Sequence, residues 1–86
     1  MGTLVKVAKK PLAQAFGSAL RKLRLAKGLS QEKLAHAAET NQAYISLLEK
    51  GIRSPSLITL DLLAHALGLK MSALVEQVER EVRAKE

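Results

Sequence analysis

The stretch that decides the fold of this chain is Lys27–Gly51, KGLSQEKLAHAAETNQAYISLLEKG. Within it, Ser30 and Asn41 are residue types whose side chains accept hydrogen bonds from the free N–H groups at the start of a helix. Two glycines, Gly28 near the start of the stretch and Gly51 at its end, are of the residue type that typically terminates helices. The stretch therefore predicts two short helices, the first beginning at Ser30 and fading near Ala38, the second over Gln42–Lys50.

Only the segment Glu39–Asn41 connects these two helices, and so short a connection forces their axes to cross at a wide angle. Because such a pair buries its inner faces poorly, further helices must complete the core. Apolar periodicity, capping residues and glycines predict three more: Pro11–Lys27, Leu57–Leu67 capped by Ser56, and a last one that Ser72 or the residue before it opens and that reaches about Ala84. The expected fold class is all-α, with five helices.

Composition narrows the possible functions of these 86 residues, which suffice for one small domain. The chain has no cysteine, which excludes disulfides, thiol catalysis and Cys-based zinc sites. Its two histidines, His36 and His65, are too few and too far apart for a His-rich metal site. No phosphate-binding loop, nucleophile elbow or H-E-x-x-H helix is present. We therefore expect no enzyme, no metal, no cofactor and no evident small-molecule ligand.

The net charge of +6 is unevenly distributed. Residues 1–55 hold ten basic and three acidic residues, whereas residues 56–86 hold four and five. A basic first part suggests a polyanionic partner, although a soluble basic protein without nucleic acid remains an alternative. Residues 1–10 are interpreted as a poorly ordered basic arm, or one lying along nucleic acid, and residues 11–86 as one domain. With no targeting or membrane-spanning segment evident, we expect a cytoplasmic protein.

A short helix, a tight turn and a second short helix in a basic protein form the helix-turn-helix arrangement. In such a motif the second helix protrudes into a DNA major groove about 12 Å wide, while the first crosses above it and contacts the backbone. We therefore interpret Gln42–Lys50 as a recognition helix.

Five runs of sequence resemble the Cro/CI-type helix-turn-helix family, also called the XRE family, of bacterial and phage regulators. They are FGSALRKLR (16–24), KGLSQEKLA (27–35), YISLLEKG (44–51), PSLITL (55–60) and LAHALG (63–68), in order and at the expected spacing. The resemblance implies a compact, lambda-repressor-like domain of five helices, usually acting as a dimer on an operator with two half-sites.

Two positions depart from the family pattern. The turn between the two short helices usually has glycine where this chain has Glu39. If that residue takes a positive φ, glutamate makes the folded state less stable than glycine would, by roughly 1 kcal/mol. The Ser or Asp that usually caps the last helix, near Lys70, is also missing, so we expect the cap to shift toward Ser72.

Base contacts are expected from the outer side of the recognition helix. Gln42 begins that helix, and a glutamine amide can pair bidentately with adenine. Ala43, Ser46 and Leu47 lie on the same side. Ser46 can hydrogen-bond to several bases, and Leu47 either touches a thymine methyl group or belongs to the core.

Phosphate contacts are expected from residues around the recognition helix. The resemblance implies this role for Gln31, which in the family also braces the first residue of that helix. Asn41, a helix cap, is a second candidate, and Tyr44 either points its hydroxyl at a phosphate or only packs in the core. Lys50 and Arg53 lie beside and after the helix end, where neutralising phosphate needs no finer geometry.

Two other charged residues, Arg24 and Glu49, could suggest DNA contact or catalysis. The resemblance instead implies a structural salt bridge between them, which ties the first helix to the recognition helix.

The last two helices carry more apolar residues than so small a domain can bury. Of the fourth helix, we assign Leu57 to the core together with Leu60, Leu63, Ala64 and Leu67. We expect the first half of the fifth helix to join the core and its second half to remain outside. Surplus apolar surface marks an interface, and a symmetric dimer is the usual closed assembly. The expected dimer residues are Ile58, Leu62, Val75, Val78 and Val82.

These features predict a sequence-specific, homodimeric transcriptional regulator that binds double-stranded DNA. Small stand-alone members of the resembling family include restriction–modification controller proteins, phage repressors and antitoxins, and the extended fifth helix favours the controller type. The alternative is an antitoxin or interaction module whose main partner is another protein. The charge asymmetry favours the regulator.

Overall fold

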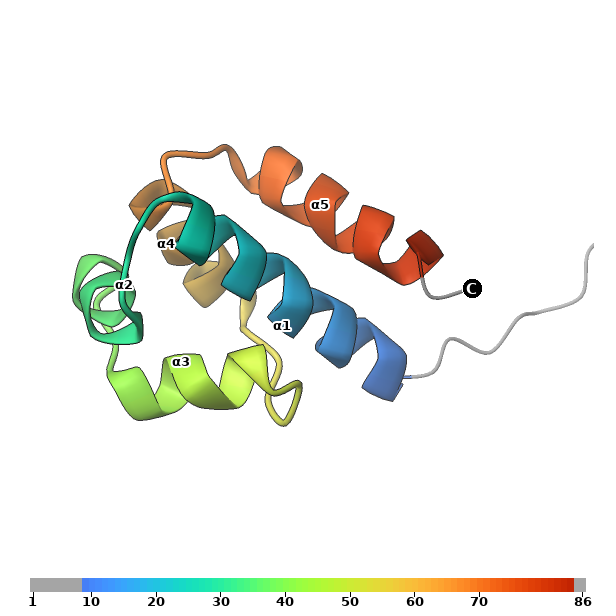
Figure 1. The fold of residues 1–86 in the computed structure, drawn as a ribbon, viewed down its shortest axis with the longest axis horizontal. Coiled ribbons are helices and arrows are strands. Elements are labelled where there is room, and N and C mark those ends of the chain that lie inside the picture. Colours follow the sequence, from blue (N-terminus) through green and yellow to red (C-terminus); the bar gives the residue numbers. More distant parts are fainter. Residues whose placement is uncertain (1–8, 85–86) are drawn as a thin grey trace, which may run out of the picture.

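The computed structural model describes residues 9–84, which form five α-helices. They are α1 (Lys9–Ala26), α2 (Gln31–Ala37), α3 (Gln42–Glu49), α4 (Leu57–Ala66) and α5 (Met71–Ala84). The all-α, five-helix prediction is therefore confirmed. As Figure 1 shows, α1 and α5 lie side by side and run in opposite directions, while α3 lies on the other side of α1.

Three of the helices begin at the capping residues that the sequence predicted. The side chains of Ser30, Asn41 and Ser56 each accept a hydrogen bond from the backbone N–H three residues later, at 3.1, 2.9 and 3.1 Å. These bonds satisfy N–H groups that have no partner within the helix. The helix starts around the turn are thus set by local sequence.

The start of α1 differs from the prediction, whereas α5 begins at the residue before Ser72, which the prediction allowed. Helix α5 begins at Met71, because the N–H of Leu74 already donates to the carbonyl of Lys70 at 3.2 Å. Ser72 lies inside the first turn, so the expected shift of the cap toward it was wrong. Helix α1 begins at Lys9, which places Pro11 in the first turn, where its missing N–H costs nothing. The expected arm falls largely on residues 1–8, outside the described residues.

The first four helices end in the same way. A residue with positive φ follows each, and the next N–H donates to the carbonyl five residues back, at 2.8–3.1 Å. This is the Schellman motif, whose left-handed residue is usually glycine. Glycine occupies that position after α1, α3 and α4, but after α2 it is Glu39, with φ 59°. The positive φ considered for Glu39 is therefore present.

The core lies between α1 and the other helices. Its largest fully buried side chains are Leu20, Leu34, Ile45, Leu48, Leu63, Leu67 and Leu74. Two expectations about the outer helices were wrong. Leu57, assigned to the core, is 73% exposed, because it lies in the first turn of α4, beyond the packed part. Val78, assigned to a dimer interface, is only 7% exposed, because α5 packs along α1.

Leu62 and Val82, which were also assigned to the dimer interface, are partly buried against the core. Less of their surface is therefore accessible than expected.

Among the described residues, no single helix is long and apolar enough to cross a membrane. Helices α4 and α5 pass that test of length and composition only as a pair, bent by 99° at the break between them. Many of their apolar side chains, such as Leu63 and Leu74, belong to the core instead.

Candidate nucleic-acid interface

The outer face of α3 is formed by the four residues expected to contact bases. Gln42 and Ala43 are exposed, and Ser46 and Leu47 are partly exposed. The inner face is formed by Ile45 and Leu48, both fully buried. Because these two residues fill the core positions of the helix, Leu47 is left on the accessible side. Helix α3 thus offers one amide, one hydroxyl and two apolar side chains to a partner.

The residues expected to contact phosphate lie at the two ends of α3 and at the start of α2. Asn41 is exposed, and its side-chain oxygen is occupied in capping α3. Tyr44 is partly buried and packs against the core. Lys50 and Arg53 are exposed after the helix, and the chain folds back there, since Arg53 N–H donates to the carbonyl of Leu47 at 3.4 Å.

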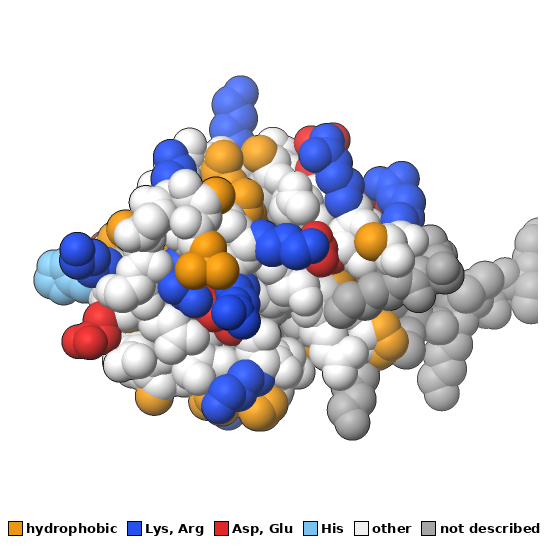
Figure 2. Space-filling model, viewed as in Figure 1, with side chains coloured by type: hydrophobic (Ala, Val, Ile, Leu, Met, Phe, Trp, Pro, Cys, Tyr) orange, Lys and Arg blue, Asp and Glu red, His pale blue; other side chains and the backbone are white. Residues whose placement is uncertain are grey.

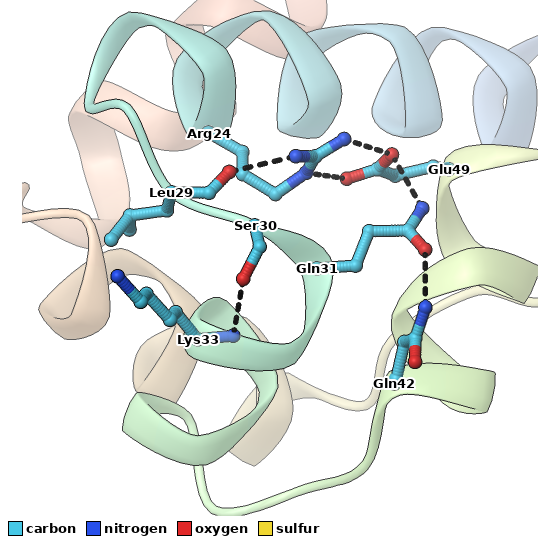
Figure 3. A network of polar contacts seen from close by, with 7 residues as sticks. All are labelled: Arg24, Leu29, Ser30, Gln31, Lys33, Gln42 and Glu49. Atoms are coloured by element: carbon cyan, nitrogen blue, oxygen red, sulfur yellow. Dashed lines mark hydrogen bonds and ion pairs between the residues drawn. The ribbon is translucent and has the colours of Figure 1, made fainter.

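A network of hydrogen bonds runs from α1 through α2 to the first residue of α3 (Figure 3). Arg24 donates through Nε and Nη2 to the two carboxylate oxygens of Glu49, at 2.6 and 3.0 Å. Its Nη1 donates to the carbonyl of Leu29 at 2.8 Å. Gln31 Nε2 donates to Glu49 Oε1 at 3.1 Å, and Gln42 Nε2 donates to Gln31 Oε1 at 3.4 Å. The network ties both ends of α3 to α1 and α2.

The centre of this network is a buried ion pair. The side chains of Arg24 and Glu49 are 9% and 5% exposed. The hydrogen bonds from Arg24 to Glu49 raise the pKa of the guanidinium above its ordinary value, so it stays charged. The salt bridge that the resemblance implied between these residues is present. Both side chains are thus paired with each other inside the protein.

The contact between Gln31 and Glu49 was not predicted from the sequence. These residues are eighteen positions apart, one at the start of α2 and one at the end of α3. No local pattern brings them together, since their contact depends on how the two helices cross. The brace between Gln31 and Gln42, which the resemblance implied, is present as the hydrogen bond described above.

A second ion pair that the sequence did not reveal connects α1 to α5. Lys22 Nζ lies 2.8 Å from Glu81 Oε2, and Glu81 is only 7% exposed. Gln77 Nε2 also donates to this carboxylate, at 3.5 Å. In the sequence, Glu81 stands among charged residues near the end of a helix, a pattern typical of a solvated face. The packing of α5 on α1 buries it.

An apolar groove of about 370 Å³ lies where α1, α5 and the loop before α4 meet. It is lined by Leu12, Ala13, Phe16, Ser54, Pro55, Leu60, Val75 and Val78. Of the five residues expected in a dimer interface, Ile58 is 75% exposed and Val75 is 40% exposed. These two side chains leave apolar surface accessible on α4 and α5.

Charged side chains are spread over the face of the molecule seen in Figure 2, where Lys and Arg outnumber Asp and Glu. Within residues 9–84, no group of three or more His, Cys, Asp and Glu side chains could hold a metal ion. His36 and His65 are both exposed, and His65 Nε2 lies 3.8 Å from Asp61 Oδ1, one turn earlier on α4.

Comparison with known proteins agrees with this architecture. A family model described as helix-turn-helix matches residues 20–74. The control protein C.MunI of a Mycoplasma species is 39% identical over 67 residues, which make up 77% of this chain and 90% of that protein.

Two solved structures are also similar. The clp gene regulator ClgR from Corynebacterium glutamicum superposes with a TM-score of 0.82 and 31% identity, over 86% of this chain and 79% of that one. The restriction-modification controller protein C.Esp1396I, solved as a tetramer with its natural 35 base-pair operator, has a TM-score of 0.75 and 28% identity, over 83% of this chain and 93% of that one. The chain belongs to the XRE-type helix-turn-helix family.

Proposed function

We propose that this protein is a sequence-specific transcriptional regulator that binds double-stranded DNA as a homodimer on an operator with two half-sites. The observation that carries the proposal is the placement of Gln42. It is exposed at the first turn of α3, and its amide is held from behind by Gln31. A recognition helix reads base edges with the residues of its N-terminal part, and a side chain held in place loses little entropy on binding.

Base reading is assigned to the outer face of α3. Gln42 pairs with a base edge in the major groove, Ser46 hydrogen-bonds to bases further along, and Ala43 and Leu47 contact thymine methyl groups. Phosphate contacts are assigned to Gln31, Asn41, Tyr44, Lys50 and Arg53. Of these, Lys50 and Arg53 are exposed cations after α3, which suits them to neutralise the backbone.

Dimerisation is assigned to the exposed apolar surface of α4 and α5. Ile58 and Val75 are its candidate contacts, with Leu62 at the edge where it is partly buried against the core. Val78 is buried and Val82 is partly buried against the core, so neither offers a full side chain to a partner. A symmetric pair of monomers would present two copies of α3 to two half-sites one DNA turn apart. The tetramer that C.Esp1396I forms on its operator supports an oligomeric mode of binding.

Within the family, we assign the protein to the controller type. The relatives C.MunI and C.Esp1396I carry that description, and this chain covers 90% and 93% of their lengths. The second candidate is a module whose main partner is another protein. It is favoured by Leu57 and Ile58, two neighbouring and strongly exposed apolar residues at the start of α4.

Selection from random DNA duplexes tests the proposal, with the wild type, Gln42→Ala and Arg53→Ala compared. We expect the wild type to select a two-part consensus. Gln42→Ala should lose about 1–3 kcal/mol of discrimination at one base pair in each half-site. Arg53→Ala should bind all sequences more weakly. The slope of the logarithm of its binding constant against the logarithm of the salt concentration should be shallower by about one unit.

The selection separates the two candidate functions. A wild type that selects no consensus, or that prefers single strands, contradicts sequence-specific duplex binding and favours the interaction module. An unchanged consensus from Gln42→Ala moves base reading to Ala43, Ser46 and Leu47, or to the shape of the DNA.

A further inference from the structure

The hydrogen-bond network of Figure 3 has a fixed direction, because it begins at a group that can only accept. Glu49 Oε1 accepts from Arg24 Nη2 at 3.0 Å and from Gln31 Nε2 at 3.1 Å. Gln31 must therefore turn its NH₂ group toward Glu49. Its carbonyl oxygen then faces the other way, toward α3. The orientation of this amide follows from the chemistry of the carboxylate.

The orientation of Gln31 decides that of Gln42 in turn. Because an oxygen of Gln31 faces it, Gln42 donates with Nε2, at 3.4 Å. An amide nitrogen carries two hydrogens, and only one is used in this bond. The Oε1 atom and the second N–H remain available on the exposed edge. Turning the amide round would bring two oxygens together and lose the hydrogen bond.

The ion pair prevents the carboxylate from rotating away. The side chain of Glu49 is 5% exposed, and Arg24, which holds both of its oxygens, is itself anchored to the carbonyl of Leu29 at 2.8 Å. Little water reaches a group so buried, so water cannot easily replace Arg24 or Gln31 as the donor. The direction of the network is thus set inside the protein, before any DNA is bound.

We propose that Glu49 is a positioning residue for base specificity, which acts through Gln31 to make Gln42 present one acceptor beside one donor. This inference rests on the proposed DNA-binding function. An acceptor beside a donor matches adenine, which offers N6–H and N7 in the major groove. Guanine offers two acceptors, O6 and N7, and would require Gln42 to turn its oxygen toward Gln31. Glu49, which touches no base, therefore disfavours guanine.

The test is the variant Glu49→Gln, whose amide can either accept from Gln31 or donate to it. Binding is titrated on duplexes that carry adenine or guanine at the base pair assigned to Gln42 by the random selection. We expect the preference for adenine to fall about two- to ten-fold, the range that one net hydrogen bond supports. The matched control is Glu32→Gln, which removes the same charge from an exposed residue of α2 and should leave the preference unchanged.

Making the same substitution in the Gln42→Ala variant separates positioning from general damage to the fold. If Glu49 acts through Gln42, then Glu49→Gln should not change the adenine preference further when Gln42→Ala is already present. An equal loss in that background overturns the inference, since Glu49 would then act by another route.

A second variant covers the loss of stability expected when Arg24 loses its anion. Gln31→Met keeps the ion pair and the side-chain length but removes the amide, and it should lower the adenine preference in the same way. If folded Gln31→Met and Glu49→Gln both keep the wild-type preference, the inference is wrong although the wild-type consensus stands. A wild type without any consensus instead contradicts the proposed function itself.

Discussion

A β-carbon on Gly17 would lie 2.5 Å from the carbonyl oxygen of Glu49, and equally close to that of Leu48. Real β-carbons do not approach backbone oxygens so closely, so only glycine allows α1 and α3 to cross at this distance. The contact places the end of α3 directly against α1, beside the Arg24–Glu49 ion pair. The position of the proposed recognition helix thus depends on residue 17 having no side chain.

The substitution Gly17→Ala should therefore destabilise the fold by about 1–3 kcal/mol, the range for overpacked cores. Helix propensity alone predicts the opposite, a gain of about 1 kcal/mol. Urea denaturation measures the difference, and Ser18→Ala, one residue along the same helix, serves as the control. Equal stability of the two variants would show that α1 and α3 can separate without cost.

Arg24→Ala should lower the free energy of unfolding by about 3–5 kcal/mol, because it leaves the buried carboxylate of Glu49 without its charged partner. Arg21→Ala removes an exposed arginine from the same helix and should change stability by less than about 0.5 kcal/mol. The folded fraction of Arg24→Ala should keep most of its sequence preference, since Glu49 can still accept from Gln31, so stability should suffer more than specificity. A variant that melts like the wild type yet loses DNA binding would make Arg24 a DNA contact.

Glu39→Gly should stabilise the protein by up to about 1 kcal/mol, because Glu39 holds φ 59° in a motif that carries glycine at the other three helix ends. Chemical denaturation measures this gain. Glu39→Ala is the control, because it removes the charge but keeps the β-carbon, and it should bring no gain. Equal stabilisation by both variants would point to the charge of Glu39 as the cause.

Ile58→Lys and Val75→Lys should each produce monomers that keep their helical content, because desolvating a lysine in an apolar interface is costly. Sedimentation measures the mass and circular dichroism the helicity. Leu25→Lys is the control, since it changes an exposed leucine at the far end of α1 from the groove and should leave a dimer. Val78 is unsuitable for this test because it is buried. Dimers that survive both changes would place the interface elsewhere.

Local sequence by itself determined the helices and most of their ends. Ser30, Asn41 and Ser56 begin helices as predicted, because a cap needs only a side-chain oxygen and an N–H group three residues away. The same is true of the helix-ending glycines, whose role depends on one backbone angle. Helix α3 and its outward residues follow from these short-range signals and from apolar spacing.

Only the tertiary structure decided which faces are buried and which distant residues meet. Val78 and Glu81 are buried because α5 packs along α1, whereas Leu57 is exposed because it lies in the first turn of α4, beyond the packed part. The hydrogen bond between Gln31 and Glu49 depends on the crossing of two helices against a third. The physical reason is range: a cap or a glycine acts over a few residues, whereas the burial of a side chain depends on elements brought together by the whole core.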